Sequence, residues 1–456
     1  MNKLQMQAQQ ELDALKVELT KDVFRDEELA EKLVKLKTIA RAPHNAPDVY
    51  SKDGISVLAE GAFGPGNEHR PSSSLECAKI LANALLLQDQ LQQLFADLNH
   101  TTSLLEFYSR SSADHEFVGG RLLFLLTYKS KVNFVALIES QQLVDHVRAH
   151  LSNHLSLITT NSFSDSLMNS MALIETLKLL YNLTSKYSGQ MSFFSKVVDT
   201  LTSIVSHISL PQQPLEPPIS QLLNALAVIE WPVRIGRESD NTLLALTRRL
   251  VELLDQSTSS LGPAQLETKI IPLITVISKL YELSVIETND LLKLKLLPQD
   301  EERDKPLGQS RTLASRLLRL QTSGGLTILP EAISGLLFDL SDRDATKFVH
   351  NIGYGHAAGY LMTHKIPIPQ ELRQEGTADR SGGRDIRINP VTGQRLDAET
   401  PVDMPAMTDE EKEREGQRLF VLFERLKATG VMNVENPMRV AQQSGRFEEL
   451  SDSEPD

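Results

Sequence analysis

Three histidines at four-residue spacing are the side chains whose types and positions most directly suggest chemistry. His146, His150 and His154 would line one face of a helix, and three imidazole rings on one face can bind zinc. The residues between them resemble those of a linker, and no acid-rich stretch stands beside them in the sequence. We therefore predict surface histidines rather than a metal site.

A glycine-rich stretch, GYGHAAG at residues 353–359, raises the question of a phosphate cradle. It does not fit the G-x-G-x-x-G pattern after a strand, because the preceding residues ATKFVHNI are typical of a helix. Close helix packing through small residues is the interpretation we favour. The chain also lacks a G-x-x-x-x-G-K-[ST] phosphate loop and a G-x-S-x-G nucleophile motif, so we expect no P-loop GTPase and no nucleophilic catalytic site.

The composition narrows the class of protein further. Cys77 is the only cysteine, which excludes an internal disulfide and a cysteine-based metal site and indicates a reducing compartment. The chain shows neither the apolar core of a signal peptide nor a window of about 18 apolar residues, so we expect a soluble protein without a membrane span. We predict a cytoplasmic protein with no cofactor and no bound metal.

The net charge is −13, and from Asp397 to the end the chain has 15 acidic and 7 basic residues. This acidic balance argues against a general nucleic-acid binder, which would present a basic surface.

Helices must position whatever functional residues the chain carries. From about residue 10 to 365, apolar residues recur at i, i+3, i+4 and i+7, the period of a helix. Six segments are candidates for inner helices, and their starts lie 45 to 62 residues apart: 75–87, 120–130, 174–185, 219–231, 270–283 and 332–342. This spacing is near the armadillo and HEAT period of about 40–47 residues. One of the segments, RLLFLLTY, is apolar on nearly every side and must be covered on several faces. We predict an all-α, armadillo/HEAT-like α-solenoid over residues 1–365, in preference to an irregular helical domain.

The helical period stops after Lys365. Residues 366–406 are polar and marked by Gly and Pro, which predicts a flexible linker. Residues 407–430 then have the pattern of an amphipathic helix, in which Thr408 and Glu411 form a capping box.

Four apolar residues of this last helix share one face: Leu419, Leu422, Phe423 and Leu426. Such a face must be buried, either as the last layer of the solenoid or against another protein, and we favour a docking helix for another protein. Residues 431–456 form an acidic tail, in which Ser451 and Ser453 stand among acids and are candidate phosphorylation sites.

Several motifs occur in an order that resembles one known family. RLLFLLT and LKLLYNLT are followed by FVHNIGYGHAAGYLM at 348–362, by RINPVTG at 387–393 and then by the amphipathic helix. This set resembles the synembryn family, whose members are guanine-nucleotide exchange factors and folding chaperones for heterotrimeric G-protein α subunits (Gα). The resemblance covers residues 30 to 430, nearly the whole chain.

The resemblance implies a superhelix whose concave face receives the C-terminal helix of Gα, while the segment after the solenoid grips the Ras-like domain of Gα. The positions that match the contact residues of the family are Lys37, Arg41, Asn83, Phe117, Tyr181 and Asn182. Lys37 stands where the family has an arginine, so the planar fork that captures a carboxylate is lost there. Each position also has a plain structural interpretation: a bonded buried asparagine, an aromatic core residue or a solvated basic face.

The resemblance implies nucleotide exchange on Gα and chaperoning of Gα folding, by a monomer that binds nucleotide-free Gα and is recruited to the plasma membrane or cell cortex through Gα. An exchange factor needs no bond-making site; it binds the nucleotide-free state of its target more tightly. The alternative is an armadillo-type adaptor that binds peptide cargo without exchange activity. Importin-like adaptors rely on ladders of Trp and Asn, and this chain has a single tryptophan, Trp231. The acidic regulatory run that the family often has before INPVTG is replaced here by TADRSGGRDIR.

Overall fold

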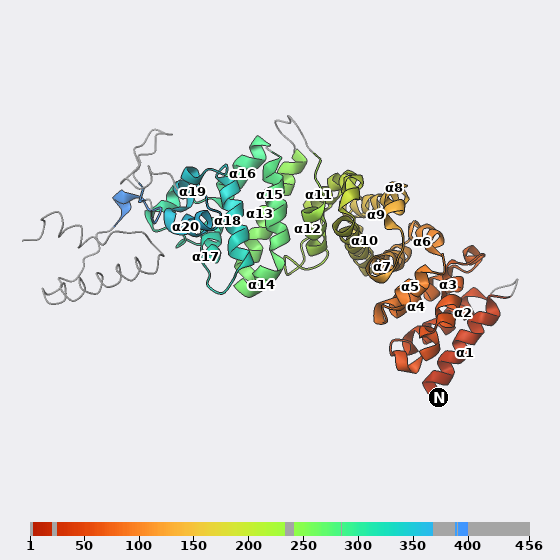
Figure 1. Ribbon diagram of the computed structural model, residues 1–456. Helices are drawn as coiled ribbons and strands as arrows, with labels where there is room; N and C mark the ends of the chain where they lie inside the picture. Colours follow the sequence, from red (N-terminus) through yellow and green to blue (C-terminus); the bar gives the residue numbers. More distant parts are fainter. Residues whose placement is uncertain are drawn as a thin grey trace, which may run out of the picture. The chain divides into compact units, whose positions relative to one another are not determined.

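Helices follow one another along the whole described part of the chain (Figure 1). The structure is a computed structural model and describes residues 3–20, 25–232, 241–283, 285–367, 388–389 and 391–399. All of these except Glu399 belong to one compact unit, Met1–Ala398. The predictions for 407–430 and for the tail, including Leu419, Leu422, Phe423, Leu426, Ser451 and Ser453, lie outside the described residues.

The first half of the unit contains α1 Lys3–Glu18, α2 Asp26–Ile39, α3 Lys52–Phe63, α4 Pro71–Leu87, α5 Leu91–Ala96, α6 Thr101–Tyr108, α7 Ala113–Lys129, α8 Phe134–Glu139, α9 Gln142–Thr159 and α10 Leu167–Lys186. The second half contains α11 Val198–His207, α12 Ile219–Val228, α13 Asn241–Ser260, α14 Pro263–Lys269, α15 Ile271–Glu282, α16 Ile286–Leu296, α17 Leu313–Gln321, α18 Ile328–Leu340, α19 Ala345–Ile352 and α20 Tyr354–Thr363. Short 3₁₀ turns include η6 Asp300–Asp304 and η8 Leu396–Ala398. The all-α prediction is confirmed for the described residues, which contain an isolated bridge but no strand.

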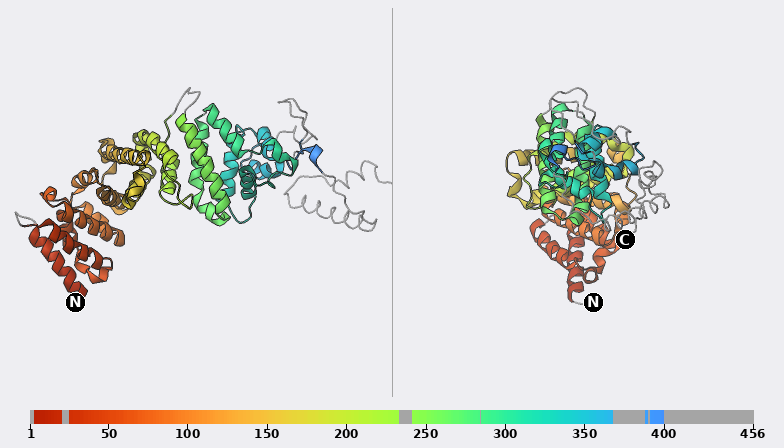
Figure 2. Two further views of the ribbon diagram at one scale, coloured as in Figure 1. Left: turned by 180° about the vertical axis from the view of Figure 1, so that it is seen from behind. Right: turned by 90° about the vertical axis from the view of Figure 1, so that its left-hand side faces the viewer.

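The six segments predicted to be inner helices form α4, α7, α10, α12, α15 and α18. Together with α2 they pack one on the next and form what we call the central series. A second series, made of α3, α6, α9, α11, α13, α16 and α17, packs against the first (Figures 1 and 2). The structure is therefore the helical solenoid that the spacing predicted.

The leucines of α7 show why these helices must be layered. Leu122, Leu123, Leu125 and Leu126 occupy different sides of the helix, and all are buried. They are covered because α4, α6 and α10 each pack on α7. Burying such a side chain contributes roughly 1.5–3 kcal/mol, so a helix with this pattern is stable only inside a stack.

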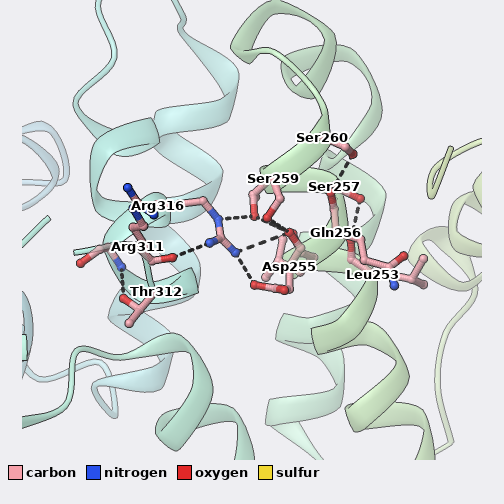
Figure 3. A network of polar contacts seen from close by, with 12 residues as sticks. Leu253, Asp255, Gln256, Ser257, Ser259, Ser260, Arg311, Thr312 and Arg316 are labelled. Atoms are coloured by element: carbon pink, nitrogen blue, oxygen red, sulfur yellow. Dashed lines mark hydrogen bonds and ion pairs between the residues drawn. The ribbon is translucent and has the colours of Figure 1, made fainter. Parts of the chain in front are cut away.

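Polar contacts join neighbouring layers near the C-terminal end of the solenoid (Figure 3). The Arg316 guanidinium of α17 reaches α13, where it pairs with the Asp255 carboxylate, and its Nε donates to Thr258 Oγ1 at 3.2 Å. The same guanidinium donates to the Arg311 carbonyl oxygen at 2.7 Å. The contact fixes α17 against α13.

Part of the range predicted as a flexible linker is packed against the solenoid. The described residues after the gap at 368–387 form a turn that is hydrogen-bonded to η6 and to the start of α20. This differs from the linker predicted over 366–406, because backbone carbonyls of the INPVTG turn accept hydrogen bonds from the solenoid instead of facing only water. No helix among the described residues is both long enough and apolar enough to cross a membrane.

Candidate partner-binding face

Three of the predicted contact residues meet in one small cavity between α2, α4 and α7. Lys37, Asn83 and Phe117 line a hollow of about 150 Å³. Two residues that the sequence interpretation had passed over, Lys79 and Arg121, complete its polar wall. The cavity joins residues that lie as far apart in sequence as α2 and α7.

The first pair of cations in this cavity shares one buried carboxylate. Glu76 is buried, and its carboxylate forms ion pairs with Lys37 and, at 2.9 Å, with Lys79. Lys79 also reaches the Asp114 carboxylate at 3.3 Å. Burial raises the pKa of Glu76, but the hydrogen bonds from Lys37 and Lys79 outweigh it, so the pKa lies below its usual value. The carboxylate therefore stays charged and holds both ammonium groups at the cavity.

The second pair of cations repeats this arrangement one layer further along. Arg121 donates to the carboxylate of Glu175 at 2.7 Å, and Lys178 reaches the same oxygen at 3.1 Å. Glu175 is 2% exposed, so its carboxylate lies under the face. The guanidinium of Arg121 also stacks over the Phe117 ring, 4.3 Å from its centroid. Phe117 is thus an aromatic support for a cation, a role beyond the plain aromatic contact that was predicted.

Farther along α7 and α10 the character of the face becomes apolar and aromatic. Tyr128 is 53% exposed and Tyr181 39% exposed, and the Lys186 ammonium lies 4.2 Å from the centroid of the Tyr128 ring. Leu86 at the end of α4 is also exposed. A solvent-accessible row of large apolar side chains on stacked helices is typical of a protein-binding surface.

The remaining two predicted contact residues are Arg41, which is exposed, and Asn182, which is buried. Arg41 follows α2, is exposed, and has no hydrogen bond or ion pair within the described part of the chain. Asn182 is buried, and its amide donates to Thr127 Oγ1 at 2.8 Å. Asn182 therefore serves the packing of α10 on α7, which is the structural alternative that the sequence left open.

A sequence signal for Lys79 and Arg121 did exist. Lys79 is the lone cation of segment 75–87, and Arg121 directly precedes the apolar run LLFLL of segment 120–130; charged residues are rarely buried without a partner. The partners Glu76 and Glu175 stand in two of the same segments. Only the stacking of α4, α7 and α10, however, decides which cation meets which carboxylate.

The histidine prediction was wrong for two of the three residues. His150 and His154 on α9 are buried, 4% and 1% exposed, and both contact the Glu116 carboxylate of α7. The Nε2 atom of His154 donates to the two Glu116 oxygens at 2.9 and 3.0 Å. The acid that the sequence seemed to lack lies 38 residues away along the chain.

This buried cluster is a structural network. Thr176 Oγ1 donates to Glu116 at 2.7 Å, and His150 Nε2 lies 2.6 Å from the Tyr108 carbonyl oxygen, which accepts a hydrogen bond from it. Burial raises the pKa of Glu116, but hydrogen bonds from His150 and His154 outweigh it and lower the pKa to about 2. Among the described residues, no group of three or more His, Cys, Asp or Glu is arranged to hold a metal ion.

The fold and this face define a class of protein: a helical-repeat scaffold whose stacked helices carry cations and exposed aromatic rings. The chain belongs to the synembryn family, since the model of guanine nucleotide exchange factor synembryn matches residues 32–446. The resemblance inferred from the motifs is thereby confirmed.

Relatives with assigned names agree with this family. The chain is 26% identical to the chaperone Ric-8A of Xenopus tropicalis, over 92% of this chain and 84% of the relative. It is 24% identical to a synembryn-like chaperone of Schizosaccharomyces pombe, over 82% of this chain and 76% of the relative. An engineered protein of known structure aligns at 14% identity with a TM-score of 0.38, over 62% of this chain and 98% of that one.

Proposed function

We propose that this chain is a guanine-nucleotide exchange factor and folding chaperone for heterotrimeric Gα subunits. In this proposal the C-terminal helix of Gα lies on the face formed by α2, α4, α7 and α10. The observation that carries the proposal is the meeting of Lys37, Asn83 and Phe117 with Lys79 and Arg121 around one cavity. The family and the names of the relatives support the same role.

The charges of the face favour an amphipathic ligand that carries a negative group. Two buried glutamates, Glu76 and Glu175, hold four cations: Lys37, Lys79, Arg121 and Lys178. Even with Asp114 counted, the cations exceed the acids by one. A carboxylate of the ligand would complete the coordination of these cations, and Tyr128 and Tyr181 would cover its apolar side.

Exchange by this face is conformational rather than chemical. A scaffold that binds nucleotide-free Gα more tightly than GDP-bound Gα accelerates nucleotide release, and each tenfold preference corresponds to about 1.4 kcal/mol. By the logic of the family, withdrawing the C-terminal helix of Gα loosens the loop that holds the guanine base. The same grip stabilises partly folded Gα by mass action, which is the chaperone role.

The amphipathic helix 407–430 supplies the second contact in this proposal. Its apolar residues Leu419, Leu422, Phe423 and Leu426 would dock on the Ras-like domain of Gα. The complex would form in the cytoplasm from a monomer of this chain, and Gα would bring it to the membrane.

The release of fluorescent GDP from purified Gα tests the proposal. Addition of the full chain should accelerate release, and Arg121→Ala should reduce the acceleration. The matched control is Arg148→Ala, because Arg148 is an exposed arginine of α9 whose one ion pair within the described part of the chain is to Asp145 of its own helix, at 3.1 Å. No acceleration with any Gα class, together with no complex on gel filtration, would favour the peptide-cargo adaptor instead.

A further inference from the structure

The residues that follow the gap at 368–387 form a compact turn of their own. The Asn389 side-chain oxygen accepts hydrogen bonds from the amides of Val391 at 2.9 Å and Thr392 at 3.2 Å. The Gly393 amide donates to the Asn389 carbonyl at 2.9 Å, and the Asn389 amide donates to the Gln394 carbonyl at 2.7 Å. We call the described residues from 388 to 398 the anchored segment.

Backbone hydrogen bonds tie the anchored segment to separate parts of the solenoid. The amide of Leu307, after η6, donates to the Thr392 carbonyl at 3.1 Å. The amide of Gly355, in the first turn of α20, donates to the Val391 carbonyl at 3.0 Å. The Arg395 amide donates in the other direction, to the Arg303 carbonyl at 2.8 Å.

Arg303 joins the anchored segment to the end of α19. The residue is 3% exposed, and Nη1 donates to the Gly393 carbonyl at 3.0 Å. Nη2 donates to the carbonyls of His350 and Asn351 at 3.1 and 3.2 Å. The C-terminal end of a helix carries partial negative charge, so it favours a guanidinium there. A lysine could not reach both sides at once, because it lacks the planar fork of donors.

The close approach of the anchored segment also explains why residues 353 and 355 are glycines. A Cβ atom on Gly355 would lie 3.1 Å from the Val391 oxygen, and one on Gly353 would lie 3.1 Å from the Gly393 amide. Gly353 also has a φ of 79°, a conformation that L side chains rarely adopt. Small residues were predicted here for helix packing, but the backbone that approaches them is that of the anchored segment.

We propose that Arg303 is a positioning residue, which fixes the place where residues 400–456 leave the solenoid. The inference rests on the proposed function, in which helix 407–430 grips Gα. With the segment anchored, Met407 lies 8 positions along the chain from Glu399; with the segment released, it lies 40 positions from Pro367. The effective concentration of a flexibly tethered group falls roughly as the −3/2 power of tether length, so release would lower it about tenfold.

Two variants and one matched control test whether the segment is anchored as described. Arg303→Gln removes the guanidinium, whereas Gly355→Val places a side chain against the Val391 carbonyl. Gly359→Val is the control, because a Cβ on Gly359 of the same helix meets nothing within 4 Å. Hydrogen exchange of the full chain should become at least about tenfold faster at the amides of Leu307 and Arg395 in both variants. Exchange should stay unchanged in the control and, for all three proteins, in α4 and α7.

The second measurement is the Gα concentration that gives half-maximal GDP release. It should rise about tenfold in Arg303→Gln and Gly355→Val, with the maximal rate and the affinity for a peptide of the Gα C-terminal helix unchanged. Unaltered hydrogen exchange in both variants would overturn the anchor itself. Faster hydrogen exchange with an unchanged half-maximal concentration would overturn the positioning role alone. Failure of the unmodified chain to accelerate release would instead remove the proposed function, and the positioning role with it.

Discussion

Replacing Glu116 by glutamine should destabilise the solenoid strongly near neutral pH and much less in acid. The carboxylate is 2% exposed and is held by His150, His154 and Thr176. Its pKa is about 2 in the folded protein, against an ordinary value of 4.5. The unfolded chain therefore takes up the proton more readily than the folded one, and the stabilisation is complete above about pH 4.5 and disappears as the pH falls toward 2.

The size of the effect follows from the two pKa values. A depression of the pKa from 4.5 to about 2 corresponds to about 3 kcal/mol at pH 7, and by linkage to roughly half of that at pH 3. Glu116→Gln keeps the shape of the side chain but removes the charge, so this pH-dependent part of the stability should be lost.

Urea unfolding followed by circular dichroism, at pH 7 and at pH 3, measures the difference between the two proteins. The control is Glu106→Gln, an exposed glutamate of α6, which should leave the midpoint unchanged at both pH values. An equal loss of stability in Glu116→Gln at pH 7 and pH 3 would refute the reasoning, because the loss would then come from packing and not from the charge.

Three further predictions concern the face, the C-terminal helix and the packing of α7. Arg121→Ala should weaken binding of a fluorescent Gα C-terminal peptide about 10- to 100-fold, the value of a charge-assisted hydrogen bond, with Arg148→Ala unchanged in the same anisotropy assay. Deletion of 407–430 should sharply reduce GDP release while the circular dichroism melt of the solenoid stays the same; an unchanged rate would remove that helix from the mechanism. Gly119→Ala should cost about 1–3 kcal/mol in thermal unfolding, since its Cβ would lie 2.9 Å from the backbone of α6, whereas Gly189→Ala, with nothing within 4 Å, should cost much less.

The periodicity of the chain was sufficient for the architecture. Six segments with recurring apolar residues predicted six inner helices, and all six form and stack. The prediction of these helices succeeded because helix formation, and the apolar surface that a helix must cover, depend on residues within a few helical turns. The motif order also identified the family, and it placed Lys37, Asn83 and Phe117 at what proved to be one cavity.

The errors all involve contacts across many residues of sequence. The histidines were taken as exposed because their acidic partner, Glu116, stands on another helix. The INPVTG stretch was taken as linker because the backbone that receives it, at Arg303 and Gly355, lies far back along the chain. Local composition cannot report such a partner, because a polar residue has the same letter whether its hydrogen bond goes to water or to protein.

The sequence by itself determined the helices, their stacking period and the family. Each of these follows from the spacing of apolar residues and from short motifs, which involve residues close together in the chain. Tertiary structure alone decided which partner each cation meets: Lys37 pairs with Glu76, Arg121 with Glu175, and Arg303 donates to the carbonyl of Gly393. The physical reason is that a buried charge is tolerated only where the fold brings its partner, and the fold brings that partner from a different layer.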